Sequence, residues 1–254
     1  MVNTTFTVCQ FLFWCVVDSV PGLNVFVNLL LTDLCGRVNH TNTTFTMSSE
    51  VEYYTKLARE MMHKRQDEDA INYFRKALKC VRNPSDTEAI KCRFNLGAAL
   101  VALHRTSEGL KVLKKVLKLV IPHKDDRLLN GDLWYNLCLA HKDLDNSAEA
   151  VRCIQQAIEC YSECLDAVAL KANSACCLAS LYMQLREFEK AAEEYAVAAS
   201  SYGTANNVTQ QAVCLFQQAQ SLQHCSKDVD AVVAAEQCVK LCSEQSDAGV
   251  GKCA

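Results

Sequence analysis

Residues 130–161 read NGDLWYNLCLAHKDLDNSAEAVRCIQQAIECY. Apolar residues recur in this stretch at helical spacing, because Trp134 stands three residues before Leu137, and Ala150 stands four before Ile154. Residues three or four apart lie on the same face of a helix. The pattern predicts two helices joined by a short turn. Its small residues lie where the helices approach closely, and its large residues fill the space between them.

The same pattern recurs on both sides of this stretch. The residues that match Ala150 are Ala70, Gly109, Ala191 and Ala231. Their successive separations along the chain are 39, 41, 41 and 40 residues. Five copies in one register predict about five helix-turn-helix units across residues 47–243.

The spacing of Trp134, Leu137, Ala150 and Ile154 follows the W-x2-L … A-x3-F skeleton of the tetratricopeptide repeat, or TPR. On these motifs the chain resembles the TPR superfamily from about Val51 to Ser243. The resemblance implies an all-α fold, a right-handed α-solenoid of about five TPR units. The usual period of this repeat is about 34 residues. The longer period here predicts longer helices or longer connections between units.

The register also predicts which side chains form the structural core. These residues recur at the small and large positions that must pack between helices. They are Leu57, Ala70, Leu96, Gly97, Trp134, Leu137, Ala150, Tyr182 and Ala191.

Composition narrows the possible partners. The 254 residues carry a net charge of −3 and contain only 8 Gly and 3 Pro, which suits a helical chain. A nucleic-acid-binding domain is typically basic. We therefore expect a protein or peptide partner and no nucleic acid.

The chain contains 16 cysteines. Cys138 takes the small-residue position that Gly97 holds one unit earlier, and Cys238 takes the position of Ala157. Cysteine at such positions behaves as a small buried apolar residue. The pattern favours reduced core thiols over disulfides, and with them a cytoplasmic location. No CxxC-type pair is present, so no metal site is predicted.

Residues 1–46 lie outside the repeat. Two apolar runs, residues 8–20 and 23–34, are interrupted by polar residues that include Asp18. A transmembrane helix needs about 20 largely apolar residues. Three interpretations stay open: a poor membrane anchor or signal, a helix that caps the first repeat, or a non-native N-terminus with Met47 as the start. At the other end, residues 244–254 are predicted to form a short polar tail.

No motif for catalysis stands out in the sequence. There is no glycine-rich phosphate loop, no Gly-x-Ser-x-Gly elbow and no His-Glu-x-x-His pair. We expect a protein that is not an enzyme and that needs no cofactor. We then expect the protein to act by binding a partner at its surface.

The TPR resemblance implies that the first helices of the units line a concave groove. Asn95 and Asn136 hold the same position in adjacent units, and an amide can both donate to and accept from a peptide backbone. Phe94, Tyr135 and Phe216 are the expected apolar anchors. The full predicted partner-binding groove consists of Lys56, Arg59, Phe94, Asn95, Tyr135, Asn136, Phe216, Gln217 and Gln220.

The predicted function is a scaffold or adaptor that binds a partner segment in this groove. One alternative is a co-chaperone adaptor, although the positions expected to hold a C-terminal carboxylate lack most of the required cations. Another is a membrane-tethered adaptor, which would need residues 1–46 to be native.

Overall fold

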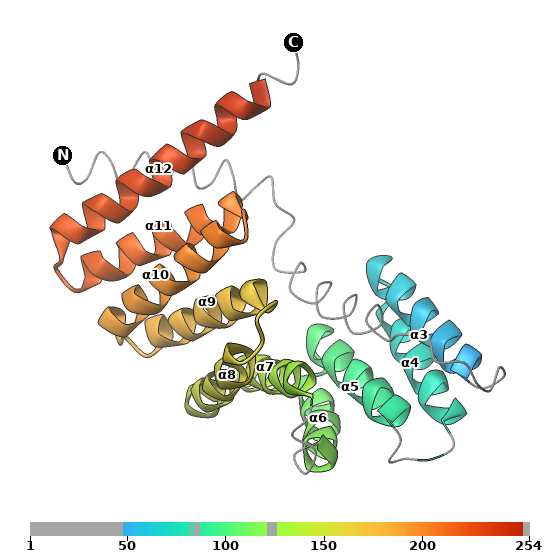
Figure 1. Cartoon of the computed structure of the whole chain (residues 1–254). Coiled ribbons are helices and arrows are strands. Elements are labelled where there is room, and N and C mark those ends of the chain that lie inside the picture. Colours follow the sequence, from blue (N-terminus) through green and yellow to red (C-terminus); the bar gives the residue numbers. More distant parts are fainter. Residues whose placement is uncertain (1–47, 82, 84–86, 121–125, 251–254) are drawn as a thin grey trace. The chain divides into compact units, whose positions relative to one another are not determined.

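The structure, a computed structural model, describes residues 48–81, 83, 87–120 and 126–250. Every regular element within these ranges is an α-helix, and the helices follow one another as pairs (Figure 1). The ten helices are α3 (Ser48–His63), α4 (Asp67–Cys80), α5 (Thr87–Ala102), α6 (Thr106–Val120), α7 (Arg127–Asp143), α8 (Ser147–Ser162), α9 (Val168–Gln184), α10 (Phe188–Thr204), α11 (Val208–His224) and α12 (Asp228–Val250). They form five helix-turn-helix units, as the register predicts.

The chain divides into two compact units, and the division falls within α8, between Cys153 and Ile154. In the first, α5 contacts α4, α6 and α7, and α3 contacts α4. In the second, α10 contacts both α9 and α11, and α11 also contacts α12. Each of these two compact units has apolar clusters of its own, formed by neighbouring helices.

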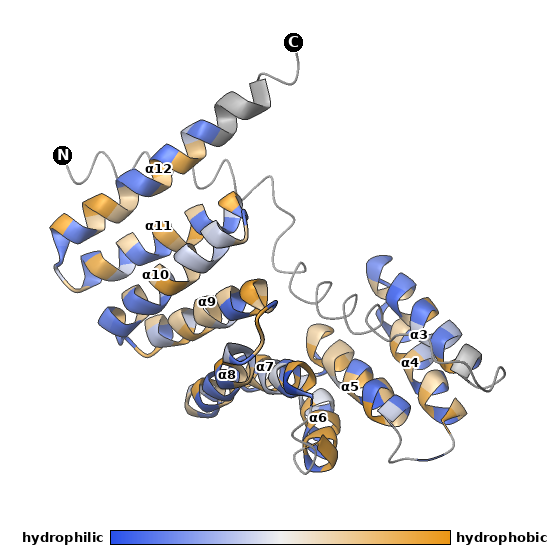
Figure 2. Ribbon diagram, in the orientation of Figure 1, coloured by the Kyte–Doolittle hydropathy of each residue, from blue (hydrophilic) through white to orange (hydrophobic). Residues whose placement is uncertain are grey.

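Each helix mixes apolar and polar residues along its length (Figure 2). In α4 the buried residues are Ala70, Ile71, Phe74 and Ala77, at the spacing of one helix face. Asp67 begins this helix, and Glu68 and Asp69 follow it in the first turn, where acidic residues stabilise the helix dipole. Local sequence and tertiary packing therefore favour the same element.

The turn inside each unit follows one pattern. Arg65, His104, Asp145, Arg186 and Ser226 all have φ between 56° and 61°, the left-handed conformation that commonly ends a helix. The amide of the residue after each of them donates to a carbonyl near the end of the first helix; for example, Asn146 N donates to His141 O at 2.9 Å. These turn residues are separated by 39, 41, 41 and 40 residues, the same intervals as the buried small residues. The backbone thus confirms the predicted register independently of side-chain packing.

Two glycines bring α5 and α6 close together. A Cβ atom added to Gly109 would lie 2.8 Å from the carbonyl oxygen of Gly97 and 2.7 Å from Cγ2 of Val101. A Cβ atom on Gly97 would lie 2.8 Å from Cγ and Cδ2 of Leu113. The register places Ala at the position of Gly109 in the other four units, so this close approach is specific to unit two.

The predicted core residues fall into two groups. Ala70, Leu96, Gly97, Leu137, Ala150 and Ala191 are buried. Leu57, Trp134 and Tyr182 are only half-buried. These three side chains are long, and part of each remains accessible to water although the small residues of the register are covered.

The last repeat unit begins with a side-chain cap and ends in a long helix. Asn207 caps α11, since its side chain accepts a hydrogen bond from Gln210 N at 3.2 Å, as the Asn-x-x-Gln spacing predicts. The last helix continues to Val250, past the predicted end of the solenoid at Ser243 and into the stretch expected to be a polar tail. Residues 1–46, with their three interpretations, lie outside the described residues.

Candidate partner-binding surface

The predicted aromatic anchors are not available to a partner. Phe94, Tyr135 and Phe216 are 1%, 4% and 3% exposed. The reason is the number of neighbours: α5 packs against three helices, and α11 packs between α10 and α12 while Ser221 Oγ also reaches Met183 of α9. A helix that packs against so many neighbours leaves little of its surface accessible to solvent. The prediction that these rings are exposed anchors is therefore wrong, and they belong to the core.

The two predicted asparagines lie in different environments. Asn95 on α5 is half-buried, whereas Asn136 on α7 is 4% exposed. Nδ2 of Asn136 donates to the carbonyl oxygen of Asp132 in the same helix at 2.8 Å. One of its two N–H donors is thus used inside the helix, and at 4% exposure the rest of the amide is covered too deeply to reach a peptide backbone. Only Asn95 keeps the accessibility that the predicted role needs.

The remaining predicted groove residues are polar and at least partly accessible. Lys56 is exposed and Arg59 half-buried, both on α3. Gln217 and Gln220 on α11 are half-buried. The first helices thus present long polar side chains to solvent, although their apolar groove positions are covered.

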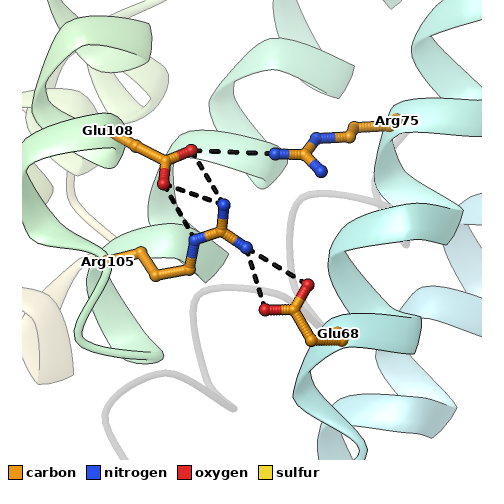
Figure 3. Close-up of polar contacts among 4 residues, drawn as sticks. All are labelled: Glu68, Arg75, Arg105 and Glu108. Carbon is orange, nitrogen blue, oxygen red and sulfur yellow. Dashed lines mark hydrogen bonds and ion pairs between the residues drawn. The ribbon is translucent and has the colours of Figure 1, made fainter.

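Charged residues from the first two repeats contact one another at the junction between these repeats (Figure 3). Nη1 of Arg105, in the turn of unit two, donates to both oxygens of Glu68 on α4 at 3.0 and 3.2 Å. Its Nε and Nη2 donate to Glu108 on α6 at 2.8 to 3.0 Å. Arg75 of α4 lies 3.7 Å from the same Glu108 carboxylate. The planar guanidinium fork lets one arginine join two carboxylates, which a lysine could not do with the same geometry.

An equivalent contact joins units four and five. Lys227, which the register aligns with Arg105, pairs with Glu189, which aligns with Glu68. The hydrogen bond from Lys227 lowers the pKa of Glu189 below its ordinary value. Beside this pair, the ring of Phe188 stacks on His224 with centroids 4.5 Å apart.

In the repeat register, Phe188 aligns with Thr106 of unit two, and His224 aligns with Asp143 of α7. Thr106 Oγ1 donates a hydrogen bond to Asp143. The same two positions therefore join neighbouring units with an aromatic stack in one place and a hydrogen bond in another. Sequence reasoning missed these contacts. The available signal was a pair of complementary residues 36 to 38 positions apart, slightly less than one repeat.

His141 is a buried polar residue at a position that is otherwise apolar or aromatic. It is 7% exposed, and its Nδ1 has no hydrogen-bond partner in the described part of the chain. The register aligns it with Met61, Leu100, Tyr182 and Leu222. Burial lowers the pKa of His141 below the ordinary 6.5, the nearby Lys114 lowers it further, and among the remaining neighbours Glu149 raises it while Arg152 lowers it.

This environment predicts an acid-sensitive fold. The folded pKa of His141 is below 6.5, so the unfolded chain binds the proton more readily, and stability falls as the pH drops below about 6.5 toward the folded pKa. We expect His141→Leu to raise the free energy of unfolding by about 1–2 kcal/mol at pH 7, because it removes a buried nitrogen without a partner. The substitution should also flatten the stability profile below pH 6.5, which urea unfolding measured from pH 5 to 8 would show.

His63 provides the control, since it is exposed at the end of α3. His63→Gln should give a stability profile close to that of the unmodified chain. An unchanged acid profile in His141→Leu would contradict this account of the buried imidazole.

The twelve cysteines in the described part of the chain are free thiols, and eight of them are buried. Burial raises the pKa of Cys153 to about 11, so this thiol stays protonated at neutral pH. Within the same part of the chain, no group of three or more His, Cys, Asp or Glu side chains could hold a metal ion. None of the described helices has the length and apolarity required to cross a bilayer.

A sequence model of the tetratricopeptide repeat family matches residues 131–166, which cover most of α7, the turn that follows it and all of α8. No curated protein matches the chain in sequence. The solved structures with a similar fold include tandem TPR-like repeats of a putative kinesin light chain from Podosopora anserina, with a TM-score of 0.67, 14% identity, and coverage of 80% of this chain and 99% of that one.

BtubC (BKLC) from P. vanneervenii gives a TM-score of 0.66 at 13% identity and covers 97% of this chain and 92% of its own. MamA gives 0.59 at 18% identity, with coverage of 79% of this chain and 96% of that one. At such low identity these likenesses concern the fold. The paired helices are therefore TPR-like units, and unit three also carries the repeat in its sequence. TPR folds in general serve protein–protein interaction.

Proposed function

We propose that this chain is a non-enzymatic scaffold that binds a segment of a partner protein along the first helices of its repeats. The observation that supports this most is the set of accessible polar side chains on first helices, which are Lys56, Arg59 and Asn95 in the compact unit that ends at Cys153, and Gln217 and Gln220 in the other compact unit. Amides and cations at these positions can hydrogen-bond the backbone and acidic groups of a peptide. Because the aromatic groove residues are buried, recognition is polar in this proposal.

The free and mostly buried thiols of the described residues are consistent with a reducing, cytoplasmic location for this scaffold. Within the repeat superfamily, the run Phe94–Ala99 and the dipeptide Gly131–Asp132 resemble tetratricopeptide repeat protein 24, and we include a closer relationship to that protein in the proposal. The co-chaperone alternative is weakened because Asn136 is buried and one of its amide N–H groups bonds within its own helix. A membrane-tethered adaptor would need residues 1–46 as its anchor, and these residues lie outside the part of the chain that the structure describes.

The test begins with the full chain as bait and identification of co-purified proteins by mass spectrometry. A purified candidate is then titrated against Lys56→Glu combined with Asn95→Ala. Each lost hydrogen bond contributes about 0.5–1.5 kcal/mol, so the double variant should bind about tenfold or more weakly. Gln155→Ala, an exposed substitution on the second helix α8, is the control and should bind normally.

Circular dichroism should show that the double variant is folded, because Lys56 is exposed and Asn95 only half-buried. A folded double variant with unchanged affinity for a partner that binds the unmodified chain would reject the first-helix surface.

A further inference from the structure

The second helices of units one and two carry a surface that the proposed function does not use. Arg75, Lys76 and Lys79 on α4 are exposed, and so are Lys114, Lys115 and Lys118 on α6. The register aligns the two sets residue for residue, 39 positions apart. We call these six residues the basic face.

The two helices are neighbours at this face. Arg75 of α4 reaches Glu108 in the first turn of α6 (Figure 3), and Arg105 connects Glu68 of α4 to the same carboxylate. Arg75, Lys76 and Lys79 also line, with other α4 residues, an open hollow of about 480 Å³. The six cations therefore lie on two helices of one compact unit that Arg75 and Arg105 connect, and the hollow lies on α4, where Asp69 also lines it.

Most of these charges are not neutralised by the protein. Lys79, Lys115 and Lys118 have no ion-pair partner among the described residues. Lys76 lies over the rings of Tyr73 and Tyr54, 4.9 and 5.9 Å from their centroids, which holds its charge in place without cancelling it. Only Arg75 shares a nearby carboxylate, and it lies 3.7 Å away.

Neither the repeat nor the helix dipole requires this arrangement. The positions aligned with Lys114, Lys115 and Lys118 are Gln155, Gln156 and Glu159 in α8, and Ala196, Val197 and Ser200 in α10. Like charges three or four residues apart on a helix are destabilising by about 0.2–0.5 kcal/mol per pair. Lys79 and Lys118 lie in the last turns of α4 and α6, where a cation complements the dipole, but Lys114 and Lys115 lie further inside α6. Helix stability therefore does not account for Lys114 and Lys115, and the face is suited to an anionic partner.

From this geometry we infer that the basic face binds an acidic segment of a protein. Cations four residues apart on α4 and α6 are spaced by one helical turn, about 6 Å. That distance matches glutamates one turn apart on a helix, and also alternate carboxylates of an extended chain, which are about 7 Å apart. A run of glutamates could pair with both helices in turn.

Two other anionic partners fit less well. A membrane-docking surface inserts apolar side chains beside its cations, and no large apolar side chain described on α4 or α6 is exposed. Single-stranded nucleic acid stacks its bases on free aromatic rings, whereas Lys76 covers Tyr54 and Tyr73. Five of the six cations are lysines, which lack the arginine fork for bidentate phosphate contacts.

The experiment measures binding of the full chain to a fluorescent poly-glutamate peptide by anisotropy, at several salt concentrations. We expect binding that weakens with salt, and an affinity about three- to tenfold lower in Lys114→Gln with Lys115→Gln, since exposed ion pairs contribute modestly. Lys114→Glu with Lys115→Glu should abolish binding. Lys171→Gln with Lys240→Gln removes the same net charge from the other compact unit and should leave the affinity unchanged.

Two parallel titrations use vesicles that contain phosphatidylserine and a single-stranded RNA homopolymer. Equal loss of peptide binding in both glutamine variants would show only a net-charge effect and would overturn the inference. Tighter, α6-dependent binding to vesicles or RNA than to the peptide would overturn it as well. The variant Lys114→Gln with Lys115→Gln should bind the first-helix partner normally, and Asn95→Ala should bind the poly-glutamate peptide normally, so failure here is distinguishable from failure of the proposed function.

Discussion

Phe74→Ala is expected to lower the free energy of unfolding by about 3–5 kcal/mol, the usual loss for a truncated core aromatic. Phe74 is 1% exposed and belongs to an apolar cluster with Ala58, Ile71, Leu96 and Leu100. That cluster joins α3, α4 and α5, so the ring supports both the first unit and its contact with the second. For a chain of this size the melting temperature should fall by roughly 6–20 °C, at about 2–4 °C per kcal/mol.

The shape of the transition is a second part of this prediction. A stack of repeats is stabilised by contacts between nearest neighbours, so losing the contact between units one and two should let unit one melt first. Differential scanning calorimetry should therefore show a broadened or split peak. Asn72→Ala, an exposed substitution on the same helix, should change stability by less than about 0.5 kcal/mol. A narrow peak at an unchanged temperature in Phe74→Ala would contradict the packing described here.

Gly109→Ala is expected to destabilise the chain by about 1–2 kcal/mol, although alanine favours a helix over glycine by about 0.5–1 kcal/mol. The added methyl would lie 2.8 Å from the carbonyl oxygen of Gly97. That oxygen is backbone, so relief requires α5 and α6 to move apart. The strain should therefore exceed the gain in helix propensity, which urea unfolding would measure.

Gly203→Ala is the matched control. Its added Cβ would lie 2.8 Å from Nε2 of Gln211, the far end of a flexible side chain that can move away. With the strain relieved, the helix propensity of alanine in α10 should leave stability unchanged or raise it by up to about 1 kcal/mol. If both substitutions changed the free energy of unfolding in the same direction, the close approach of α5 and α6 would not be what distinguishes Gly109.

The repeat register could be predicted because it rests on spacing. Ala70, Gly109, Ala150, Ala191 and Ala231 must be small wherever two helices cross closely, and that requirement is visible in a single sequence. The left-handed turn residues repeat at the same intervals, yet none of the five is glycine. Residue type therefore did not indicate these turns, and only the backbone shows them.

The candidate site was predictable only in part. A family position can indicate that Phe94 belongs to a first helix, but not that three neighbouring helices surround it. Burial is a property of the assembled fold. Likewise, Asn95 and Asn136 are equivalent in the register, and what separates them is burial, since Asn136 is 4% exposed and Asn95 is only half-buried. The Glu68–Arg105–Glu108 network depends on the offset between units, which the repeat period alone does not give.

The central claim is that the first helices bind a protein partner, and site-specific photo-crosslinking tests it most directly. A photoreactive amino acid would replace Lys56, Asn95 or, as the control, Gln155 in the full chain expressed in cells, and the adducts would be identified by mass spectrometry. Positions 56 and 95 should both crosslink to the same protein, and position 155 should not. Absence of a shared adduct at positions 56 and 95, or the same adduct at position 155, would contradict the account.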